Sequence, residues 1–329
     1  MTVRTVTAAD TRFLLREEGS GAGRPVLLLH GVPETSSIWR DVAPTLAAGR
    51  RVLAPDLPGL GGSAYSGGFD VPSLVRQLVA LVEAEAQGPV DLVGHDWGGS
   101  LALALAGARP DLVARLVVIN APYREVPLLR AAHIPFFALP AVPELLFRVG
   151  GRRVVDAMLA LGWKASTPLD EERRAEYEAA YTDPEKVRAM LGYYRGVARP
   201  KLKALATRSA PAAPPRVHVA QSLVLWGALD PVLPISTGES VVRDLGASCV
   251  MVTVPGAGHF VVEEAPSVVA SVLGDFLHLE DAPPAAKAPA KKAPAKKAPA
   301  KAAAKKAPAR KAPAKGAPRK EAPPSPGTP

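Results

Sequence analysis

The chain of 329 residues lacks the features that mark secreted, disulfide-bonded or membrane-spanning proteins. It contains one cysteine, Cys249, which excludes an internal disulfide framework, and the apolar neighbours of this residue favour an inert core thiol. No apolar run reaches the length of about 18 residues that a transmembrane helix needs. Residues 1–10 have no charged segment followed by an apolar one, as a secretion signal would. We therefore expect a cytoplasmic protein that makes no membrane contact.

The excess of positive charge is confined to one end of the chain. The formal net charge is +9, yet residues 282–329 contain 13 Lys or Arg and one acid, whereas residues 1–281 carry 27 basic and 30 acidic side chains. The basic segment repeats Lys-Ala-Pro-Ala-Lys and has no large apolar residues, so it predicts a disordered tail. Such arms bind polyanions weakly, although no aromatic side chain here could stack on bases. A solubilising tail without a partner is the alternative.

The remaining 281 residues alternate between strand-like and helix-like segments, which is typical of a mostly parallel, doubly wound α/β sheet. The apolar runs expected to form central strands cover residues 26–30, 51–54, 90–93, 112–120, 222–226 and 248–254. Helical segments are predicted at 37–48, 71–86 and 266–277, and a β-hairpin at 2–16.

The alternation stops at residue 121 and returns near residue 221. The segment between is helix-like, and Pro-rich residues 210–215 close it. We interpret residues 121–215 as an inserted helical cap over the carboxyl ends of the strands, where such sheets bind ligands. The sheet domain is then built from two parts, residues 1–120 and 216–281, and is followed by the tail at 282–329.

The stretch Val-Asp-Leu-Val-Gly-His-Asp-Trp-Gly-Gly at residues 90–99 predicts a sharp turn between a buried strand and a helix. Its glycines permit close backbone contacts, and the turn lifts Asp96 beside a helix N-terminus. A carboxylate at this position can displace a leaving group from an sp3 carbon and form an alkyl ester on the enzyme. Taken alone, a glycine-rich turn after a strand is also common as a purely structural feature.

Hydrolysis of such an ester requires an activated water, a base and an oxyanion site. Asp230 and His259 each follow a predicted strand, in the order nucleophile, acid, base. We therefore predict that Asp96, Asp230 and His259 form a catalytic triad. The backbone amides of Val32 and Trp97 are the expected oxyanion donors.

These motifs resemble those of the α/β-hydrolase superfamily, in the branch that contains epoxide hydrolases and haloalkane dehalogenases. The matching segments are His-Gly-Val-Pro-Glu at 30–34, Gly-His-Asp-Trp-Gly-Gly at 94–99, Trp-Gly-Ala-Leu-Asp at 226–230 and Gly-His at 258–259. The resemblance covers residues 26–277 and excludes the tail. It implies an α/β-hydrolase fold with an inserted cap and a reaction that needs no metal or other cofactor.

Epoxide hydrolases stabilise the leaving oxygen with two cap side chains, usually tyrosines. The segment Gly-Tyr-Tyr-Arg at 192–195 resembles one such motif and implies this role for Tyr194; ordinary helix packing is the alternative. His133 stands where the second tyrosine often occurs, and some relatives use a His/Tyr pair. The apolar side chains expected to line a pocket for a small apolar epoxide are Trp39, Phe136, Phe137, Trp163 and Phe260.

The favoured hypothesis is an enzyme that opens epoxides to diols through an ester of Asp96. Haloalkane dehalogenation is the rival: Trp97 and Trp163 are possible halide donors, but Val32 stands where dehalogenases commonly carry Asn. Fluoroacetate dehalogenases pair a cap His with an adjacent Trp and bind the substrate carboxylate with Arg beside the nucleophile. This chain has Ile134, Trp97 and Ser100 at those positions, which disfavours a haloacid substrate. A hypothesis of another class is a polyanion-binding protein that acts through its tail.

Overall fold

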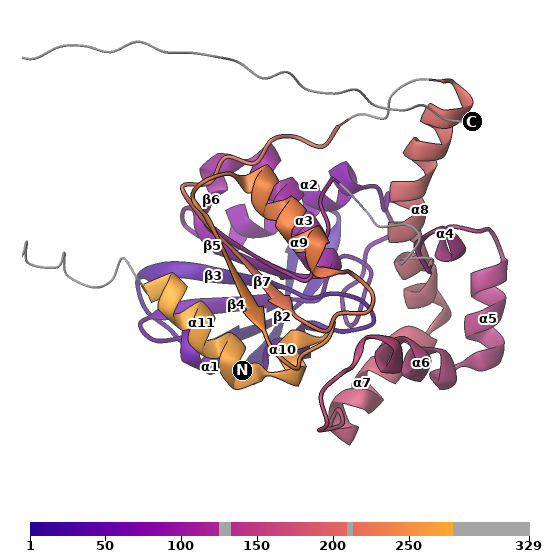
Figure 1. The fold of residues 1–329 in the computed structure, drawn as a ribbon, viewed down its shortest axis with the longest axis horizontal. Coiled ribbons are helices and arrows are strands. Elements are labelled where there is room, and N and C mark those ends of the chain that lie inside the picture. The colour runs from indigo at the N-terminus through magenta and orange to yellow at the C-terminus, as the bar shows by residue number, and fades with distance from the viewer. Residues whose placement is uncertain (125–132, 209–212, 279–329) are drawn as a thin grey trace, which may run out of the picture. The chain divides into compact units, whose positions relative to one another are not determined.

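The computed structural model describes residues 1–124, 133–208 and 213–278 (Figure 1). They contain an eight-stranded sheet with the strand order β1-β2-β4-β3-β5-β6-β7-β8. Its strands are β1 (Thr2–Ala8), β2 (Thr11–Glu18), β3 (Gly23–Leu29), β4 (Arg50–Pro55), β5 (Val90–His95), β6 (Val113–Ile119), β7 (Gln221–Gly227) and β8 (Cys249–Val254). The predicted tail at 282–329 lies outside the described residues.

The sheet is mostly parallel, as predicted. Strands β3 to β8 pair in parallel, and only the β1–β2 hairpin at one edge runs antiparallel to its neighbours. The central strands are buried on both faces because helices cover both, which explains their continuous apolar runs. In Figure 1, α2 (Val71–Glu85), α3 (Trp97–Ala108) and α9 (Ile235–Leu245) lie on one face, and α1 (Ala43–Leu46) and α11 (Pro266–His278) lie on the other.

The single helix predicted at 37–48 was wrong. The structure has a 3-10 turn, η1 (Ser36–Trp39), followed by the short helix α1. The side chain of Thr35 accepts a hydrogen bond from Ser37 N and starts the first turn. Pro44 stands in the first turn of α1, where its missing N–H costs nothing; inside one continuous helix it would remove a backbone hydrogen bond. The apolar periodicity that predicted one helix is thus spread over two short elements, η1 and α1.

The described helices between β6 and β7 are α4 (His133–Phe137), α5 (Val142–Gly150), α6 (Arg152–Gly162), α7 (Glu171–Thr182) and α8 (Pro184–Ala206), here called the cap. The cap contacts loops that follow parallel strands: Tyr181 donates a hydrogen bond to Glu34 O after β3, and Tyr193 to Pro58 O after β4. The cap therefore lies at the carboxyl ends of the strands. None of the helices in the described ranges is long and apolar enough to cross a membrane.

Candidate active site

Asp96 lies in the sharp turn between β5 and α3, in a strained conformation (φ 50°, ψ −117°). Neighbouring glycines make the turn possible. A Cβ on Gly98 would lie 2.3 Å from Leu29 O, and one on Gly94 would lie 2.3 Å from Gly98 O. Because these contacts are with backbone atoms, a larger residue would force the strand and the helix apart. The turn presents Asp96 above the ends of the strands.

The two carboxylate oxygens of Asp96 have different surroundings. Val32 N donates a hydrogen bond to Oδ1 at 3.0 Å, and the backbone amide of Trp97 also binds this carboxylate. Oδ2 instead faces the imidazole of His259, whose Nε2 is 3.3 Å away. Oδ1 thus accepts a hydrogen bond from a backbone amide, whereas Oδ2 faces the imidazole.

His259 is held in place through its other nitrogen. Its Nδ1 donates to Asp230 Oδ2 at 2.8 Å, and Asn120 Nδ2 donates to the same oxygen at 2.6 Å. The other oxygen of Asp230 accepts from Val232 N at 2.7 Å and Leu233 N at 2.9 Å. The Asp230 carboxyl is fully buried, whereas the Asp96 side chain retains 17% exposure. Only the Asp96 end of this chain of hydrogen bonds is therefore open to a substrate.

Burial and charge act in opposite directions on these groups. Burial opposes the ionisation of Asp96, but the hydrogen bond and charge of His259 outweigh it and lower the pKa of Asp96. The pKa of Asp230 is lowered by the same balance. Burial also disfavours a charged His259, yet the two flanking carboxylates raise the pKa of His259 well above its ordinary value. The two carboxylates therefore favour the protonated imidazole.

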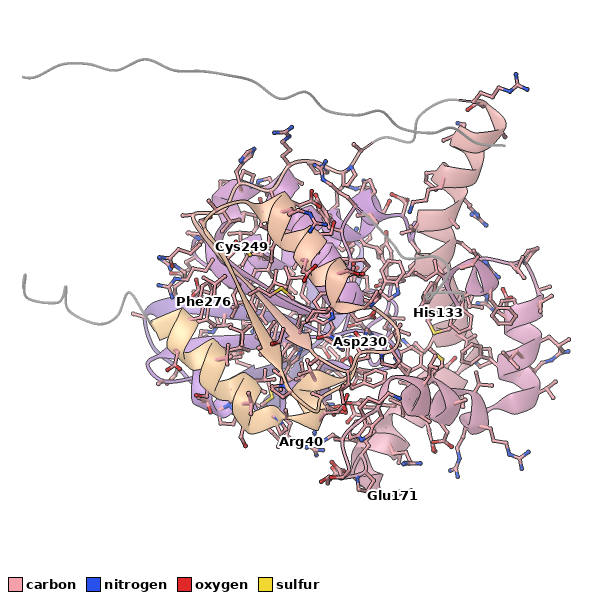
Figure 2. The ribbon with its side chains drawn as sticks, viewed as in Figure 1. Arg40, His133, Glu171, Asp230, Cys249 and Phe276 are labelled. Carbon is pink, nitrogen blue, oxygen red and sulfur yellow. The ribbon has the colours of Figure 1, made fainter. Side chains whose placement is uncertain are left out.

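Tyr194 and His133, on the cap helices α8 and α4, lie next to each other over this centre. Their ring centroids are 6.0 Å apart, and the Tyr194 ring packs edge-on to Trp97 at 5.1 Å. Burial and the charge of Asp96 raise the pKa of Tyr194, so the phenol keeps its proton. Burial lowers the pKa of His133, which favours the neutral imidazole. Figure 2 shows His133 on the cap and Asp230 in the sheet domain.

The five side chains expected to line a pocket have different surroundings. Phe137 packs on Tyr194 with centroids 5.1 Å apart and contacts Phe136. Phe260 packs against His259 at 5.2 Å and Trp163 at 6.4 Å. Trp39 is fully buried in the hydrophobic core. Their part in substrate binding stays a prediction.

The sequence motifs contained two further polar residues whose role was not predicted, Glu34 and His95. His95 donates from Nδ1 to Glu34 Oε2 at 2.8 Å and from Nε2 to the carbonyl oxygen of His259 at 2.9 Å. Burial lowers the pKa of His95, but the charge of Glu34 outweighs burial and raises it. A buried ion pair thus supports the backbone of His259. The signal in the sequence was an acid and a histidine that both follow buried strands.

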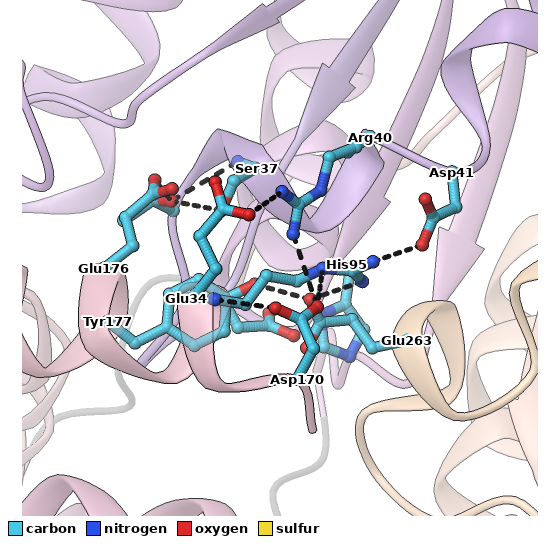
Figure 3. Close-up of polar contacts among 12 residues, drawn as sticks. Glu34, Ser37, Arg40, Asp41, His95, Asp170, Glu176, Tyr177 and Glu263 are labelled. Atoms are coloured by element: carbon cyan, nitrogen blue, oxygen red, sulfur yellow. Dashed lines mark hydrogen bonds and ion pairs between the residues drawn. The ribbon is translucent and has the colours of Figure 1, made fainter. Parts of the chain in front are cut away.

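Cap helix α7 is attached to the sheet domain beside this ion pair (Figure 3). Tyr177 donates to Glu263 Oε1 at 2.6 Å, and Arg173 Nη1 lies 3.2 Å from the same oxygen. Arg173 also pairs with Asp41. Burial, followed by the charge of Glu34, raises the pKa of Glu263 to about 7. These contacts were not predicted because they depend on how the cap packs, which no local pattern reveals.

The fold and the site define a hydrolase-type α/β protein with an acid at the turn between β5 and α3. Residues 24–266 match the family model described as the alpha/beta hydrolase fold. The chain belongs to this family.

The chain is similar to proteins named as epoxide hydrolases and to one named as a lipase. Epoxide hydrolase 3 of Xenopus tropicalis is 28% identical over 289 residues, covering 81% of this chain and 74% of the relative. Lipase LipV of Mycobacterium tuberculosis is 34% identical over 239 residues, covering 70% and 76%. The crystal structure of Epoxide Hydrolase A from Mycobacterium thermoresistibile aligns with a TM-score of 0.68 at 26% identity, covering 84% of this chain and 98% of that one. Because these relatives differ in named activity, the choice between reactions rests on the site.

Proposed function

We propose that this protein is an epoxide hydrolase that converts small apolar epoxides to diols through an alkyl ester of Asp96. The observation that carries the proposal is the unequal setting of the Asp96 oxygens, with Oδ1 on the Val32 amide and Oδ2 facing His259 beneath Tyr194. A serine at this position would suit acyl transfer, whereas a carboxylate suits displacement at an sp3 carbon. The relatives and the structural neighbour named as epoxide hydrolases support this choice.

In the first step, Asp96 Oδ2 attacks an epoxide carbon and the bond from that carbon to the ring oxygen breaks. The electron pair passes to the ring oxygen, which receives a proton or hydrogen bond from the Tyr194 phenol. Since burial and the Asp96 charge raise the pKa of Tyr194, the phenol is protonated at neutral pH and can donate. Neutral His133 offers one further N–H to the same oxygen.

Ester formation prepares the second step by removing one negative charge. In the free protein, the two flanking carboxylates favour the protonated form of His259. Once Asp96 is esterified, only Asp230 remains charged, so the pKa of His259 falls and its Nε2 proton passes to solvent. Nε2 can then accept a proton from water. The resulting hydroxide attacks Asp96 Cγ, and the developing charge on Oδ1 lies at the Val32 and Trp97 amides. The Cγ–O bond to the substrate then breaks, and His259 returns the proton to the departing diol oxygen. The Asp96 carboxyl group passes its proton to His259, and a proton from solvent replaces any that Tyr194 donated, which restores the free protein.

The direct test of the proposal is to trap the ester. His259→Gln removes the base while leaving Asp96, and loss of such a base slows a reaction by about 10²–10⁴-fold. Mass spectrometry of this variant after exposure to styrene oxide should find the Asp96 peptide heavier by one epoxide. The matched control, Asp96→Ala in the same background, should show no adduct. Absence of an adduct across a broad panel of epoxides would refute the proposal.

Haloalkane dehalogenation is less well supported by the contacts in the cap. A halide leaving group needs N–H donors that are free to face it. The indole N–H of Trp163 donates to Thr167 O at 3.0 Å, and the side chain of Trp97 interacts with the Tyr194 phenol. Parallel assays of diol formation and halide release separate the two reactions.

The tail carries a separate proposal that rests on sequence alone. Its 13 Lys or Arg and one acid favour weak, salt-sensitive contact with polyanions. A gel shift with the full chain and with a variant ending at residue 281 should show binding only by the full chain at low salt. Absence of binding by both would leave solubility as the role of the tail.

A further inference from the structure

One carboxylate, that of Glu264 in α10 (Val261–Glu264), binds both the segment that bears His259 and the cap. Its Oε2 accepts backbone hydrogen bonds from Lys164 N and Ala165 N, both at 2.7 Å, and from Gly258 N at 2.9 Å. Its Oε1 accepts from Phe260 N at 3.0 Å. Two of these donors follow cap helix α6, and the other two stand on either side of His259. One side chain thus links the base to the cap.

Two glycines allow the same segments to meet backbone to backbone. His259 N donates to Gly162 O at 2.9 Å. A Cβ on Gly258 would lie 2.2 Å from Gly162 O, and one on Gly162 would lie 2.7 Å from the Phe260 ring. The end of α6 and the His259 segment are therefore in direct contact, and this contact has no room for a side chain.

The preceding residue, Glu263, faces a different part of the cap. Its carboxyl group contacts Tyr177 and Arg173 of α7, as described above. The two adjacent acids therefore have different partners. Glu263 binds side chains of α7, whereas Glu264 accepts hydrogen bonds from backbone amides around His259 and after α6. The positions of backbone N–H donors are fixed by the path of the chain. Their hydrogen bonds to a charged carboxylate are stronger than hydrogen bonds between neutral groups. Glu264 is therefore the acid placed to set the position of the imidazole.

We propose that Glu264 is a positioning residue for His259. Through its carboxylate, the position of the cap on the sheet domain determines the position of the His259 imidazole. The carboxylate holds Gly258 and Phe260 in register with Lys164 and Ala165, and this register keeps His259 Nε2 beside Asp96 Oδ2. The kinetic consequence rests on the proposed function. It falls on the second step, since water activation depends on His259, whereas ester formation depends on Asp96 and Tyr194.

The first experiment needs no substrate. Hydrogen exchange of the full chain is compared for wild type, Glu264→Gln and Glu264→Ala, with Glu239→Gln as a control because Glu239 is an exposed acid on α9. Peptides covering residues 162–166 and 256–262 should exchange at least about tenfold faster in Glu264→Ala, since four amides lose their acceptor. Glu264→Gln should fall between, because one amide oxygen can still accept. Unchanged exchange in both segments would overturn the proposal.

The second experiment separates the two chemical steps by rapid-quench single turnovers with styrene oxide. Ester formation in Glu264→Gln should stay within about twofold of wild type. The rate of ester hydrolysis should fall about 10- to 100-fold, which is less than the loss of about 10²–10⁴-fold expected without a general base, because His259 is displaced and not removed. Equal losses in both steps would mean that Glu264 is only structural, and would overturn the positioning role. If wild-type protein forms no ester, the proposed function fails, and the exchange result alone decides whether Glu264 holds the His259 segment to the cap.

Discussion

The two halves of the site are built differently. In the sheet domain, Asp96, Asp230 and His259 each follow a parallel strand, and backbone amides hold the carboxylates of the first two. In the cap, Tyr194 and His133 are positioned mainly by aromatic packing on Trp97 and Phe137. Strand topology therefore fixes the positions of the proposed nucleophile, base and acid, whereas side-chain packing fixes the groups proposed to assist the leaving oxygen. We expect changes in the first half to have larger effects than changes in the second.

The largest effect is expected for Asp96→Ala. Without the carboxylate no ester can form, so turnover of an epoxide should fall by about 10⁴-fold or more. Diol formation measured by chromatography checks this. The melting temperature should fall, because the lowered pKa of Asp96 means that the fold stabilises its charge, and the substitution takes one carboxylate partner from His259. Residual turnover above a tenth of wild type would contradict the assignment.

Tyr194→Phe tests the cap half. The variant keeps the ring that packs on Trp97 and Phe137 but removes the donor, and loss of one such donor costs about 10²–10³-fold. Ester formation should slow by this amount in single turnovers, while hydrolysis of ester already formed should be nearly unchanged. His133→Phe is the matched comparison and should have a smaller effect. Equal slowing of both steps by Tyr194→Phe would mean that the phenol acts through packing.

The pH dependence of stability probes the attachment of the cap. Burial and the charge of Glu34 raise the pKa of Glu263 to about 7, and Arg173 and Tyr177 face the same carboxyl group. An acid with a raised pKa stabilises the fold most below its unfolded pKa and loses that contribution as pH rises through the folded value. Wild type should therefore lose more thermal stability than Glu263→Gln between pH 5 and pH 8, as calorimetry can measure. If the melting temperatures of the two proteins change equally with pH, the raised pKa of Glu263 is contradicted.

The smallest effect is expected for Trp163→Phe. Because the indole N–H donates to Thr167 O, the substitution should cost stability by about 1 kcal/mol and change kcat/KM for an epoxide by less than about threefold. Calorimetry and steady-state assays measure the two quantities. A large loss confined to halide release from haloalkanes would show instead that Trp163 serves a halide.

Much of the sheet half could be predicted from the sequence, because apolar runs place the strands and order along the chain places Asp96, Asp230 and His259 after them. The structure brings these three side chains together, and their catalytic roles stay a prediction. The roles of Glu264 and of the Glu34–His95 pair could not be predicted. Their hydrogen bonds join segments up to 164 residues apart and depend on how the cap is seated. The prediction of one helix at 37–48 was wrong for a local reason. Apolar periodicity does not reveal that one helical turn ends at Trp39 and that a second helix, with Pro44 in its first turn, begins at Ala43.

The central claim is that the carboxylate of Asp96 becomes covalently bound to the substrate. A single turnover in H₂¹⁸O, with protein in excess over styrene oxide, tests it directly by mass spectrometry of both products. The account predicts that the label enters the Asp96 carboxylate and that the diol is unlabelled, because water attacks Cγ. Label in the diol with an unlabelled Asp96 would show direct attack of water on the epoxide and would contradict the account.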